Sequence, residues 1–390
     1  MALFYSIDWF SSPALNVLLA LFIAAVIVQL YFILFVFTKI LWRPSAAPPK
    51  KWAGVSIIVC AHNEAHNLKE LLPMLDEQDY PDYEVIVMND RSWDGTEEWA
   101  ETSAVAFRHV HFMHIDKEYD HVTPKKYALT TGIRHAKHDI VLLTDADCRP
   151  TTDQWLKGMV ECLAADKEIV LGFSPYEKHG GFLNLLIRFE TFYTAVQYLS
   201  FALAGRPYMG VGRNLLYRKK TFLNNKGFYS HLKVTGGDDD LLMNEIANKT
   251  NTAVCVNPDA FMVSIPKKTW KEWYRQKKRH LSVSKHYKIH HKIRLACLSA
   301  SQVLSWVLGL VIFSLGIVWY PASLGYLIIA GSAFLLRLLS LWIVLGLASR
   351  RLYKTVGWFS IPFLDWVLFV YYITMGIVMW SNRRKKVRWR

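Results

Sequence analysis

The sequence predicts an α/β domain with a mostly parallel sheet, together with transmembrane helices at both ends of the chain. Two observations predict this. Apolar residues make up 52% of the 390 residues and the mean hydropathy is +0.14, which exceeds what one soluble core needs. Short β-branched runs alternate with helical patterns in the middle of the chain, an order typical of parallel strands covered by helices.

Charge-free apolar segments lie near both ends of the chain. Residues 14–38 are long enough to cross a bilayer core of about 30 Å as a helix. Residues 295–336 are too long for one crossing, and we expect two helices there with a turn at residues 319–323. A last segment, residues 358–380, contains only Asp365 as a charge.

The first apolar segment is interpreted as an anchor. It lacks the basic start and the small-residue cleavage site of a signal peptide. Lys39 and Arg43 follow it directly, so the positive-inside rule places residue 50 onward in the cytosol. Five cysteines without paired metal-type spacing agree with a reducing compartment. We therefore expect an integral protein of the plasma (inner) membrane with a cytosolic middle domain.

The basic tail at residues 383–390 conflicts with this topology. If all four apolar segments cross the membrane, the tail lies outside, which its charge disfavours. Either the last segment is re-entrant or interfacial, or the charge rule fails here, and the sequence leaves both explanations open. The net charge of +14 gathers near the apolar segments, so we expect membrane lipids as partners and no nucleic acid.

Polar residues follow three expected strands, at residues 55–60, 84–88 and 140–144, and a helix is expected at residues 67–78. Ligands of parallel sheets bind beyond the carboxyl ends of the strands. The polar groups at these ends are His62-Asn63-Glu64, Asn89-Asp90-Arg91-Ser92 and Asp145-Ala146-Asp147.

Asp145 and Asp147 form the candidate metal site. A two-residue period points both carboxylates the same way at a strand end, and such hard oxygen ligands suit Mg or Mn. Asp-x-Asp is also common in turns, but the apolar strand before it favours the metal site. A divalent ion there would neutralise charge on a departing diphosphate.

Further candidates lie on the donor side. The Asp90 carboxylate suits hydrogen bonds from a nucleobase or ribose, whereas Asp94 and Thr96 are expected to cap the next helix. Lys125 and Lys126 begin a predicted helix, from which they reach a diphosphate or remain solvated.

Three adjacent acids, Asp238, Asp239 and Asp240, precede an apolar helix. One acid is enough to cap it. Mutual repulsion raises the pKa of at least one of the three, which suits that carboxylate to take a proton from an acceptor hydroxyl. A single base of this kind fits an in-line displacement with inversion at the anomeric carbon.

Together these motifs resemble the membrane-bound glycosyltransferase family 2 enzymes of the GT-A fold, which include cellulose, hyaluronan and ceramide glucosyl synthases. The resemblance covers about residues 52–285. It implies that the turn with Glu64 and the motif with Asp90 contact the donor nucleoside. It also implies a metal site at Asp145 and Asp147, and it places Asp238 at the catalytic base position with Asp239 as the alternative.

The family's fourth motif, Gln-x-x-Arg-Trp, is similar to Gln276-Lys277-Lys278-Arg279-His280, with histidine in place of the aromatic residue. By resemblance, Arg279 binds the donor diphosphate, and Gln276 and His280 bind the acceptor. Gly210-Val211-Gly212-Arg213-Asn214 resembles the acceptor-side loop, which makes Asn214 a further acceptor candidate.

The expected function is inverting, metal-dependent transfer of a sugar from a UDP-sugar to a lipid-linked or polysaccharide acceptor. A processive synthase that also translocates its product is the first alternative. A membrane transporter is suggested by Arg337 and Asp365 inside apolar segments, and an inactive binding module is a third alternative. Neither of these last two explains the intact acidic motifs.

Four regions are therefore expected: an anchor and linker at residues 1–50, a catalytic GT-A domain at 51–266, an interfacial segment at 267–294 and a membrane region at 295–390. The third contains eleven Lys and Arg residues against Glu272 alone, interleaved with aromatic residues. Residues 182–203 are expected to form a helix that lies at the membrane interface or is buried.

Overall fold

The computed structural model describes residues 13–42, 51–320 and 323–381. The chain divides into two compact units, of which the larger contains residues 42–288 and 350–355 and the smaller contains the apolar helices from both ends of the chain. The predicted linker at residues 44–49 and the basic tail at 383–390 lie outside the described residues.

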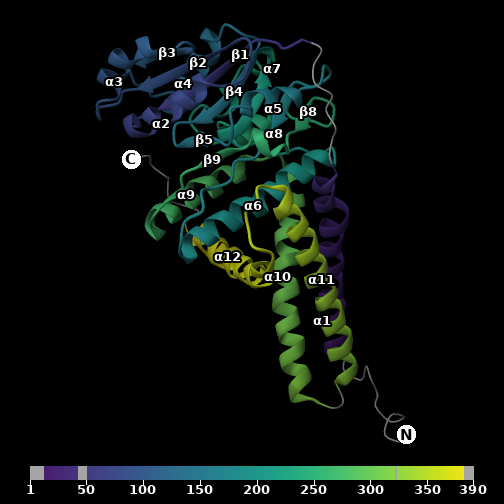
Figure 1. Ribbon diagram of the computed structural model, residues 1–390. Helices are drawn as coiled ribbons and strands as arrows, with labels where there is room; N and C mark the ends of the chain where they lie inside the picture. The colour runs from purple at the N-terminus through teal and green to yellow at the C-terminus, as the bar shows by residue number, and fades with distance from the viewer. Residues whose placement is uncertain (1–12, 43–50, 321–322, 382–390) are drawn as a thin grey trace, which may run out of the picture. The chain divides into compact units, whose positions relative to one another are not determined.

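The larger unit is built on a seven-stranded sheet with strand order β3-β2-β1-β4-β7-β6-β8 (Figure 1). Neighbouring strands from β3 to β4 are parallel, as are β6 and β8, whereas β7 is antiparallel to both of its neighbours. The prediction of a mostly parallel sheet is confirmed. The strands are β1 (Val55–Ala61), β2 (Tyr83–Asp90), β3 (Val110–Ile115), β4 (Ile140–Asp145), β6 (Ile169–Leu171), β7 (Leu215–Arg218) and β8 (Thr252–Val254).

Within the described residues, two short strands and eight α-helices complete this unit. A separate two-stranded sheet pairs β5 (Cys148–Pro150) with β9 (Met262–Ser264). The helices are α2 (Ala65–Asp76), α3 (Thr96–Ser103), α4 (Pro124–His135), α5 (Trp155–Glu161), α6 (Phe182–Leu203), α7 (Lys219–Asn224), α8 (Asp240–Ile246) and α9 (Trp270–Val283). The bounds of α6 match the prediction, and most of its residues are buried.

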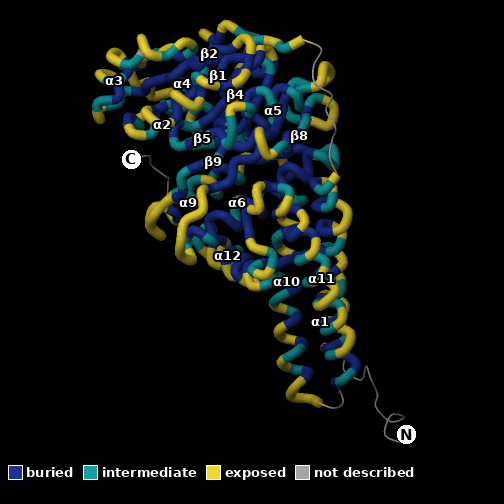
Figure 2. Tube along the Cα trace, in the orientation of Figure 1, coloured by how far each residue is buried: buried dark blue, intermediate teal, exposed yellow. Residues whose placement is uncertain are grey.

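Helices cover the sheet because both faces of its central strands are apolar. In β1, Ile57 and Val59 pack in the cluster that also holds the leucines of α2 and the apolar residues of α5. Ile58 faces α4, where a Cβ added to Gly132 would lie 3.0 Å from it, so the glycine allows the helix to pack closely. Figure 2 shows the resulting buried strands beneath more exposed outer helices. The carboxyl ends of β1, β2 and β4 therefore lie side by side at one edge of the sheet.

The smaller unit contains α1 (Pro13–Tyr31), α10 (Ile289–Val318), α11 (Leu324–Arg351) and α12 (Ile361–Ser381). Four helical segments of the described chain are long and apolar enough to cross a membrane: Pro13–Leu41, Ile289–Val318, Leu324–Arg351 and Trp358–Val378. The predicted pair of helices within residues 295–336 is confirmed. Phe22, Ile312 and Tyr326 form part of a shared core, whereas Leu310 and Leu335 are 52% and 54% exposed. Outward apolar side chains of this kind fit a lipid environment.

Two predicted intramembrane charges meet inside this unit. Arg337 on α11 and Asp365 on α12 form an ion pair whose side chains are both 0% exposed. Gln302 donates to Asp365 Oδ1 at 2.7 Å and Trp306 Nε1 donates to Asp365 Oδ2 at 3.1 Å. Since each charge is compensated locally, the pair is accounted for as a structural contact that joins α10, α11 and α12.

The last helix differs in direction from the other three. In Figure 1, α1, α10 and α11 run along one another, whereas α12 lies across their direction. It is tied to them near its start, where Trp342 Nε1 donates to the carbonyl of Trp358 at 2.9 Å and Asp365 meets Arg337. A bundle of four aligned helices is therefore not formed.

Removal of one member of the buried pair should destabilise the smaller unit. Arg337→Leu or Asp365→Leu leaves an uncompensated buried charge, which we expect to lower the free energy of unfolding by about 3–5 kcal/mol. The double variant Arg337→Leu/Asp365→Leu should recover much of that loss. Thermal unfolding in detergent measures all three variants, and single variants as stable as the parent would contradict the structural role.

Candidate active site

Acidic residues meet at the carboxyl ends of the parallel strands. Asp90 is the last residue of β2 and Asp145 is the last residue of β4, and both strands flank β1. In the register, Ala61 pairs with Asn89 and Cys60 pairs with Asp145, so the two strand ends lie level with each other. The expected meeting of these motifs at one edge is a consequence of the parallel arrangement.

Asp145 and Asp147 lie on either side of a buried alanine. Both are half-buried, and the carbonyl of Asp147 accepts from the Ile265 amide at 3.0 Å. Burial, and then the charge of Asp145, raises the pKa of Asp147. Two carboxylates that disfavour each other's charge in this way are stabilised by a nearby cation.

Lys125 supplies such a cation to two acidic motifs at once. It is the second residue of α4, after Pro124, and its ammonium lies 2.9 Å from Asp145 Oδ1 and 3.1 Å from Asp238 Oδ2. Burial opposes the charge of Lys125, but Asp145 and then Asp238 outweigh it and raise the pKa well above its ordinary value. A single side chain therefore joins the expected metal motif to the expected base.

The three adjacent acids have three different environments. Asp239 caps α8, with Oδ1 accepting from the Asp240 amide and Oδ2 accepting from the Gly212 amide, both at 2.7 Å. Asp240 Oδ2 accepts from the Tyr287 hydroxyl at 2.9 Å. Asp238 alone pairs with Lys125. The ordinary capping explanation thus holds for Asp239, while Asp238 is the acid at the strand edge.

The charges of these acids separate their pKa values. Burial, together with the charge of Asp238, raises the pKa of Asp239, and burial with the charge of Asp239 raises that of Asp240 well above its ordinary value. Burial acts in the same direction on Asp238, but the charge of Lys125 outweighs it and lowers the pKa. The raised pKa that the sequence predicts for the base is thus found at Asp239 and Asp240, whereas Asp238 is held as a carboxylate, the form that a proton acceptor requires.

A glycine pair precedes Asp238 and shapes its turn. Gly236 and Gly237 have φ of 81° and 73°, which side chains other than glycine rarely adopt. A Cβ on Gly237 would lie 2.8 Å from Leu241 Cγ, and one on Gly236 would lie 3.4 Å from Val283 Cγ2. Helix α9 therefore packs on this turn.

The donor-side loops are tied to each other. Asn63 Oδ1 accepts from the Trp93 amide and the Asn63 amide donates to Ser92 Oγ, both at 2.9 Å. The Asp90 carboxylate accepts from Arg91 Nε at 2.8 Å. Glu64 precedes α2 and accepts from Asn67 Nδ2 at 2.5 Å, and burial raises its pKa.

The expected capping role of Asp94 is matched by two contacts. Its Oδ1 accepts from the Thr96 amide at 3.2 Å at the start of α3. Its Oδ2 accepts from the Ala65 amide at 3.0 Å at the start of α2. Asp94 thus accepts hydrogen bonds from the first turns of both helices with both of its carboxylate oxygens.

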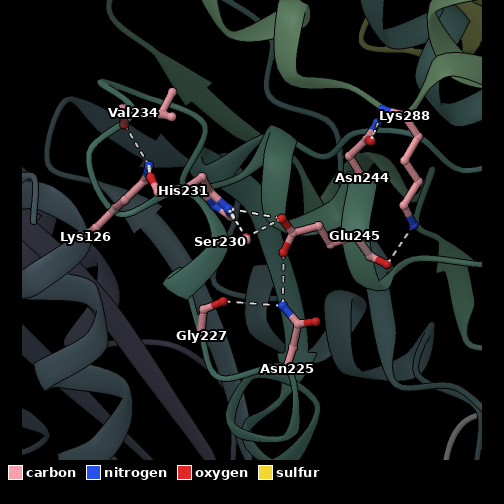
Figure 3. A network of polar contacts seen from close by, with 9 residues as sticks. All are labelled: Lys126, Asn225, Gly227, Ser230, His231, Val234, Asn244, Glu245 and Lys288. Atoms are coloured by element: carbon pink, nitrogen blue, oxygen red, sulfur yellow. Dashed lines mark hydrogen bonds and ion pairs between the residues drawn. The ribbon is translucent and has the colours of Figure 1, made fainter.

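Lys126 does not lie where either expectation for it placed the side chain. It is only 1% exposed, and its ammonium donates to the carbonyls of His231 at 2.6 Å and Val234 at 2.7 Å (Figure 3). It is therefore not solvated, and its hydrogen bonds are directed at the chain before Asp238 rather than at the acids around Lys125. Burial lowers its pKa to about 8.

Asn214 lies in the core rather than at an accessible surface. Its exposed fraction is 0%, and its Nδ2 donates to the carbonyls of Phe173 at 2.9 Å and Ala260 at 2.8 Å. Its Oδ1 accepts from Trp155 Nε1 at 3.0 Å. These contacts place it as a buried link between segments, away from the acceptor role expected from its motif.

Gln276 of α9 and an arginine that the sequence reasoning did not single out both contact Tyr176. Gln276 Nε2 donates to the Tyr176 hydroxyl at 3.2 Å, and the Arg213 guanidinium lies 4.5 Å over the Tyr176 ring. Arg213 Nη1 is buried without a hydrogen-bond partner. Its place in the glycine-rich motif was the available signal. His280, on the same helix, is exposed, and Arg279 Cγ lies 3.9 Å from a Cβ built on Gly236.

The donor set around Asp145 and Asp147 fits an incompletely coordinated divalent ion. Among the described residues, no three His, Cys, Asp or Glu side chains converge as a complete metal cage. Two carboxylates at a strand end match the sparse protein coordination that Mg²⁺ and Mn²⁺ accept when phosphate oxygens complete it. The Lys125 ammonium, 2.9 Å from Asp145, is a cation that such an ion would displace or adjoin.

Comparisons with known proteins agree with this arrangement. The glycosyl transferase family 2 model matches residues 56–224. Glycosyltransferase AglE of Haloferax volcanii is 32% identical over 112 residues, which are 28% of this chain and 35% of that protein. A poly-β-1,6-N-acetyl-D-glucosamine synthase of Staphylococcus epidermidis is 32% identical over 95 residues, 24% of this chain and 22% of the synthase. The chain thus matches about a third or less of these curated relatives.

A solved structure supports the fold over a longer range. The mannosyltransferase PcManGT from Pyrobaculum calidifontis, in complex with GDP-Man and Mn²⁺, aligns with a TM-score of 0.53 at 21% identity. The alignment covers 82% of this chain and 98% of that one. Residues 56–224 therefore match a family 2 glycosyltransferase domain, and the chain has the GT-A fold.

Proposed function

We propose that the protein is an inverting, metal-dependent membrane glycosyltransferase that moves a sugar from a UDP-sugar to a lipid-linked or polysaccharide acceptor. The observation that carries this proposal is the Lys125 ammonium, which lies between Asp145 Oδ1 and Asp238 Oδ2 at 2.9 Å and 3.1 Å. It brings a carboxylate of the candidate metal site and the carboxylate of the proposed base to the same ammonium group.

In this proposal the acceptor hydroxyl attacks the anomeric carbon of the donor sugar. Asp238 accepts the hydroxyl proton as the new glycosidic bond forms, and the bond between the anomeric carbon and the diphosphate oxygen breaks. The nucleoside diphosphate leaves, and a single displacement inverts the anomeric centre. A Mg or Mn ion held by Asp145 and Asp147 would supply neutralising charge to the leaving diphosphate.

Other side chains bind and orient the substrates. Glu64 and Asp90 are proposed to contact the nucleoside, and Lys125 and Arg279 to contact the diphosphate. Gln276, held by Tyr176, and the exposed His280 are proposed to contact the acceptor. Asp239 remains the alternative base, although its two bonds at the start of α8 favour the capping role.

The class of acceptor and the nucleobase of the donor are the parts of this proposal that an assay must identify. One relative is named as a polysaccharide synthase, and the Pyrobaculum mannosyltransferase was solved with a guanosine rather than a uridine donor. A radiolabelled panel of UDP- and GDP-sugars, offered with membrane lipids in Mg²⁺ or Mn²⁺, identifies the donor and the acceptor class. The length of the product separates a single transfer from chain extension.

Asp238→Asn should reduce transfer by about 10² to 10⁴, because general-base catalysis typically contributes that factor. Binding of the nucleoside diphosphate should remain, since Asp238 acts on the acceptor. Asp239→Asn is the matched control, and we expect it to retain most transfer, because asparagine caps a helix about as well as aspartate. The opposite result, an active Asp238→Asn and an inactive Asp239→Asn, would move the base to Asp239.

Chelation should abolish transfer, and added Mn²⁺ should restore it. Asp145→Asn and Asp147→Asn should weaken Mn²⁺ binding in the presence of nucleoside diphosphate, measured by electron paramagnetic resonance, because each removes an anionic ligand. Asp94→Asn serves as the control, since this acid caps two helices. Full transfer in the presence of chelator would reject the metal-dependent mechanism.

We further propose that α1, α10 and α11 cross the membrane and that α12 does not. With the amino terminus outside, three crossings place the end of α11, with Arg350 and Arg351, in the cytosol, in line with the positive-inside rule. The direction of α12 in Figure 1 supports this, as does the grouping of residues 350–355 with the catalytic unit.

Reporter fusions test this topology. A fluorescent protein fused after residue 390 should fluoresce and alkaline phosphatase fused there should be inactive, because both then lie in the cytosol. The same fusions after residue 355 are the control, since that point is cytosolic whether or not α12 crosses. Active phosphatase at residue 390 alone would show that α12 spans the membrane.

A further inference from the structure

The chain that leads to Asp238 has little regular structure of its own. Between the end of α7 at Asn224 and the start of α8 at Asp240 it forms a short 3₁₀ turn at Tyr229–His231 and otherwise turns. Gly227 has φ of 59°, and the Gly236-Gly237 pair also has positive φ. Because glycines restrict the backbone least, the position of Asp238 depends on contacts made by the preceding residues. We call residues 225–234 the approach loop.

The first set of contacts ties the approach loop to the start of α4. The Lys126 ammonium donates to the carbonyls of His231 and Val234 at 2.6 Å and 2.7 Å (Figure 3). The Thr123 amide donates to the Leu232 carbonyl at 3.1 Å. Lys126 directly follows Lys125, which pairs with Asp238. The same turn of helix therefore holds the approach loop and the acid that follows it.

The second set ties the approach loop to α8, on the other side of Asp238. Glu245 Oε2 accepts from Asn225 Nδ2 at 3.1 Å, and Oε1 accepts from Ser230 Oγ and lies 3.2 Å from His231 Nδ1 (Figure 3). Burial opposes the charge of Glu245, but the bonds from His231, Ser230 and Asn225 outweigh it and lower its pKa to about 2. Glu245 is thus held as a carboxylate that joins the start of the approach loop to its middle.

The far end of α8 is fixed as well. The Lys288 amide donates to Asn244 Oδ1 at 2.9 Å, and Lys288 Nζ donates to the Glu245 carbonyl at 3.1 Å (Figure 3). Helix α8 is therefore not free to move with the approach loop. It is the fixed support against which Glu245 holds it.

We infer that Lys126 and Glu245 are positioning residues that set the placement of Asp238 through the approach loop, and that neither contacts the donor or the acceptor. This inference rests on the proposed function, in which Asp238 is the base. Two adjacent lysines then have different roles: Lys125 faces the acids of the site, and Lys126 fixes the backbone that presents one of them. A misplacement of about 1 Å in such a base costs on the order of 10²-fold in rate.

Steady-state kinetics of Lys126→Met, with Lys125→Met as the matched neighbour, test the inference. Methionine keeps the length and apolar packing of lysine but donates no hydrogen bond. We expect Lys126→Met to lower kcat by about 10- to 100-fold, while the donor KM and the calorimetric Kd for nucleoside diphosphate and Mn²⁺ stay within about twofold. Lys125→Met should instead weaken nucleoside diphosphate binding. Weakened binding in Lys126→Met would overturn the inference and return Lys126 to the donor site.

A double-mutant cycle separates positioning from a general loss of folded protein. In the Asp238→Asn background, Lys126→Met should cause no further loss of the residual transfer, because its effect acts through a group already removed. If Lys126→Met lowers the rate of the Asp238→Asn variant by the same factor as it lowers that of the parent, the inference is overturned. Thermal unfolding of each variant confirms that it is folded at the assay temperature.

Two further variants guard against a Lys126→Met protein that does not fold. Glu245→Gln and the milder Ser230→Ala, at an exposed side chain, weaken the contacts between the approach loop and α8. Both should lower kcat while donor binding stays unchanged. Unchanged kcat in both would overturn the role of Glu245. If the parent is inactive with every donor, or Asp238→Asn is fully active, the proposed function itself fails. That outcome differs from an active parent whose kcat is unchanged by these variants, which overturns the inference alone.

Discussion

The site depends on one shared ion pair. The Lys125 ammonium compensates Asp145 at the end of β4 and Asp238 at the end of a glycine-rich turn, which are far apart in sequence. Without a cation between them, the half-buried Asp145 and the buried Asp238 would disfavour each other's charge. Burial makes that cost larger, so the sheet edge, α4 and the turn before α8 must be held in register for the pair to form. The order of the surrounding loops follows from this requirement.

The loops around this ion pair are held in place mainly by side chains that bind backbone groups. Asp94 occupies the first turns of α2 and α3, Asp239 caps α8, and Lys126 holds the approach loop by two carbonyls. Charged residues near the site therefore divide into those that satisfy backbone groups and those that pair with one another, as Lys125 does with Asp145 and Asp238. The smaller unit follows the same rule, since its buried Arg337 and Asp365 compensate each other.

Much of the fold was predictable because its signals are local. Apolar runs predicted three strands, β1, β2 and β4, within two residues and α6 over its full length, and the break at residues 319–323 separated two long helices. Individual side-chain roles were harder to predict. Asn214 and Lys126 belong to motifs that suggested ligand contact, yet both are buried with their polar atoms bonded inside the protein. Arg213, beside Tyr176, belongs to the same motif as Asn214, but the sequence suggested no role for it.

The sequence by itself determined the α/β class, the apolar helices at both ends and the order of the acidic motifs, because hydrophobic period and residue type act over a few neighbours. It also carried the family resemblance that the comparisons confirmed. Only the tertiary structure decided which of three adjacent acids faces Lys125, which of two adjacent lysines is buried, and how α12 is directed. These outcomes depend on which distant carbonyls, amides and charges fold against each side chain, and no local pattern encodes those partners.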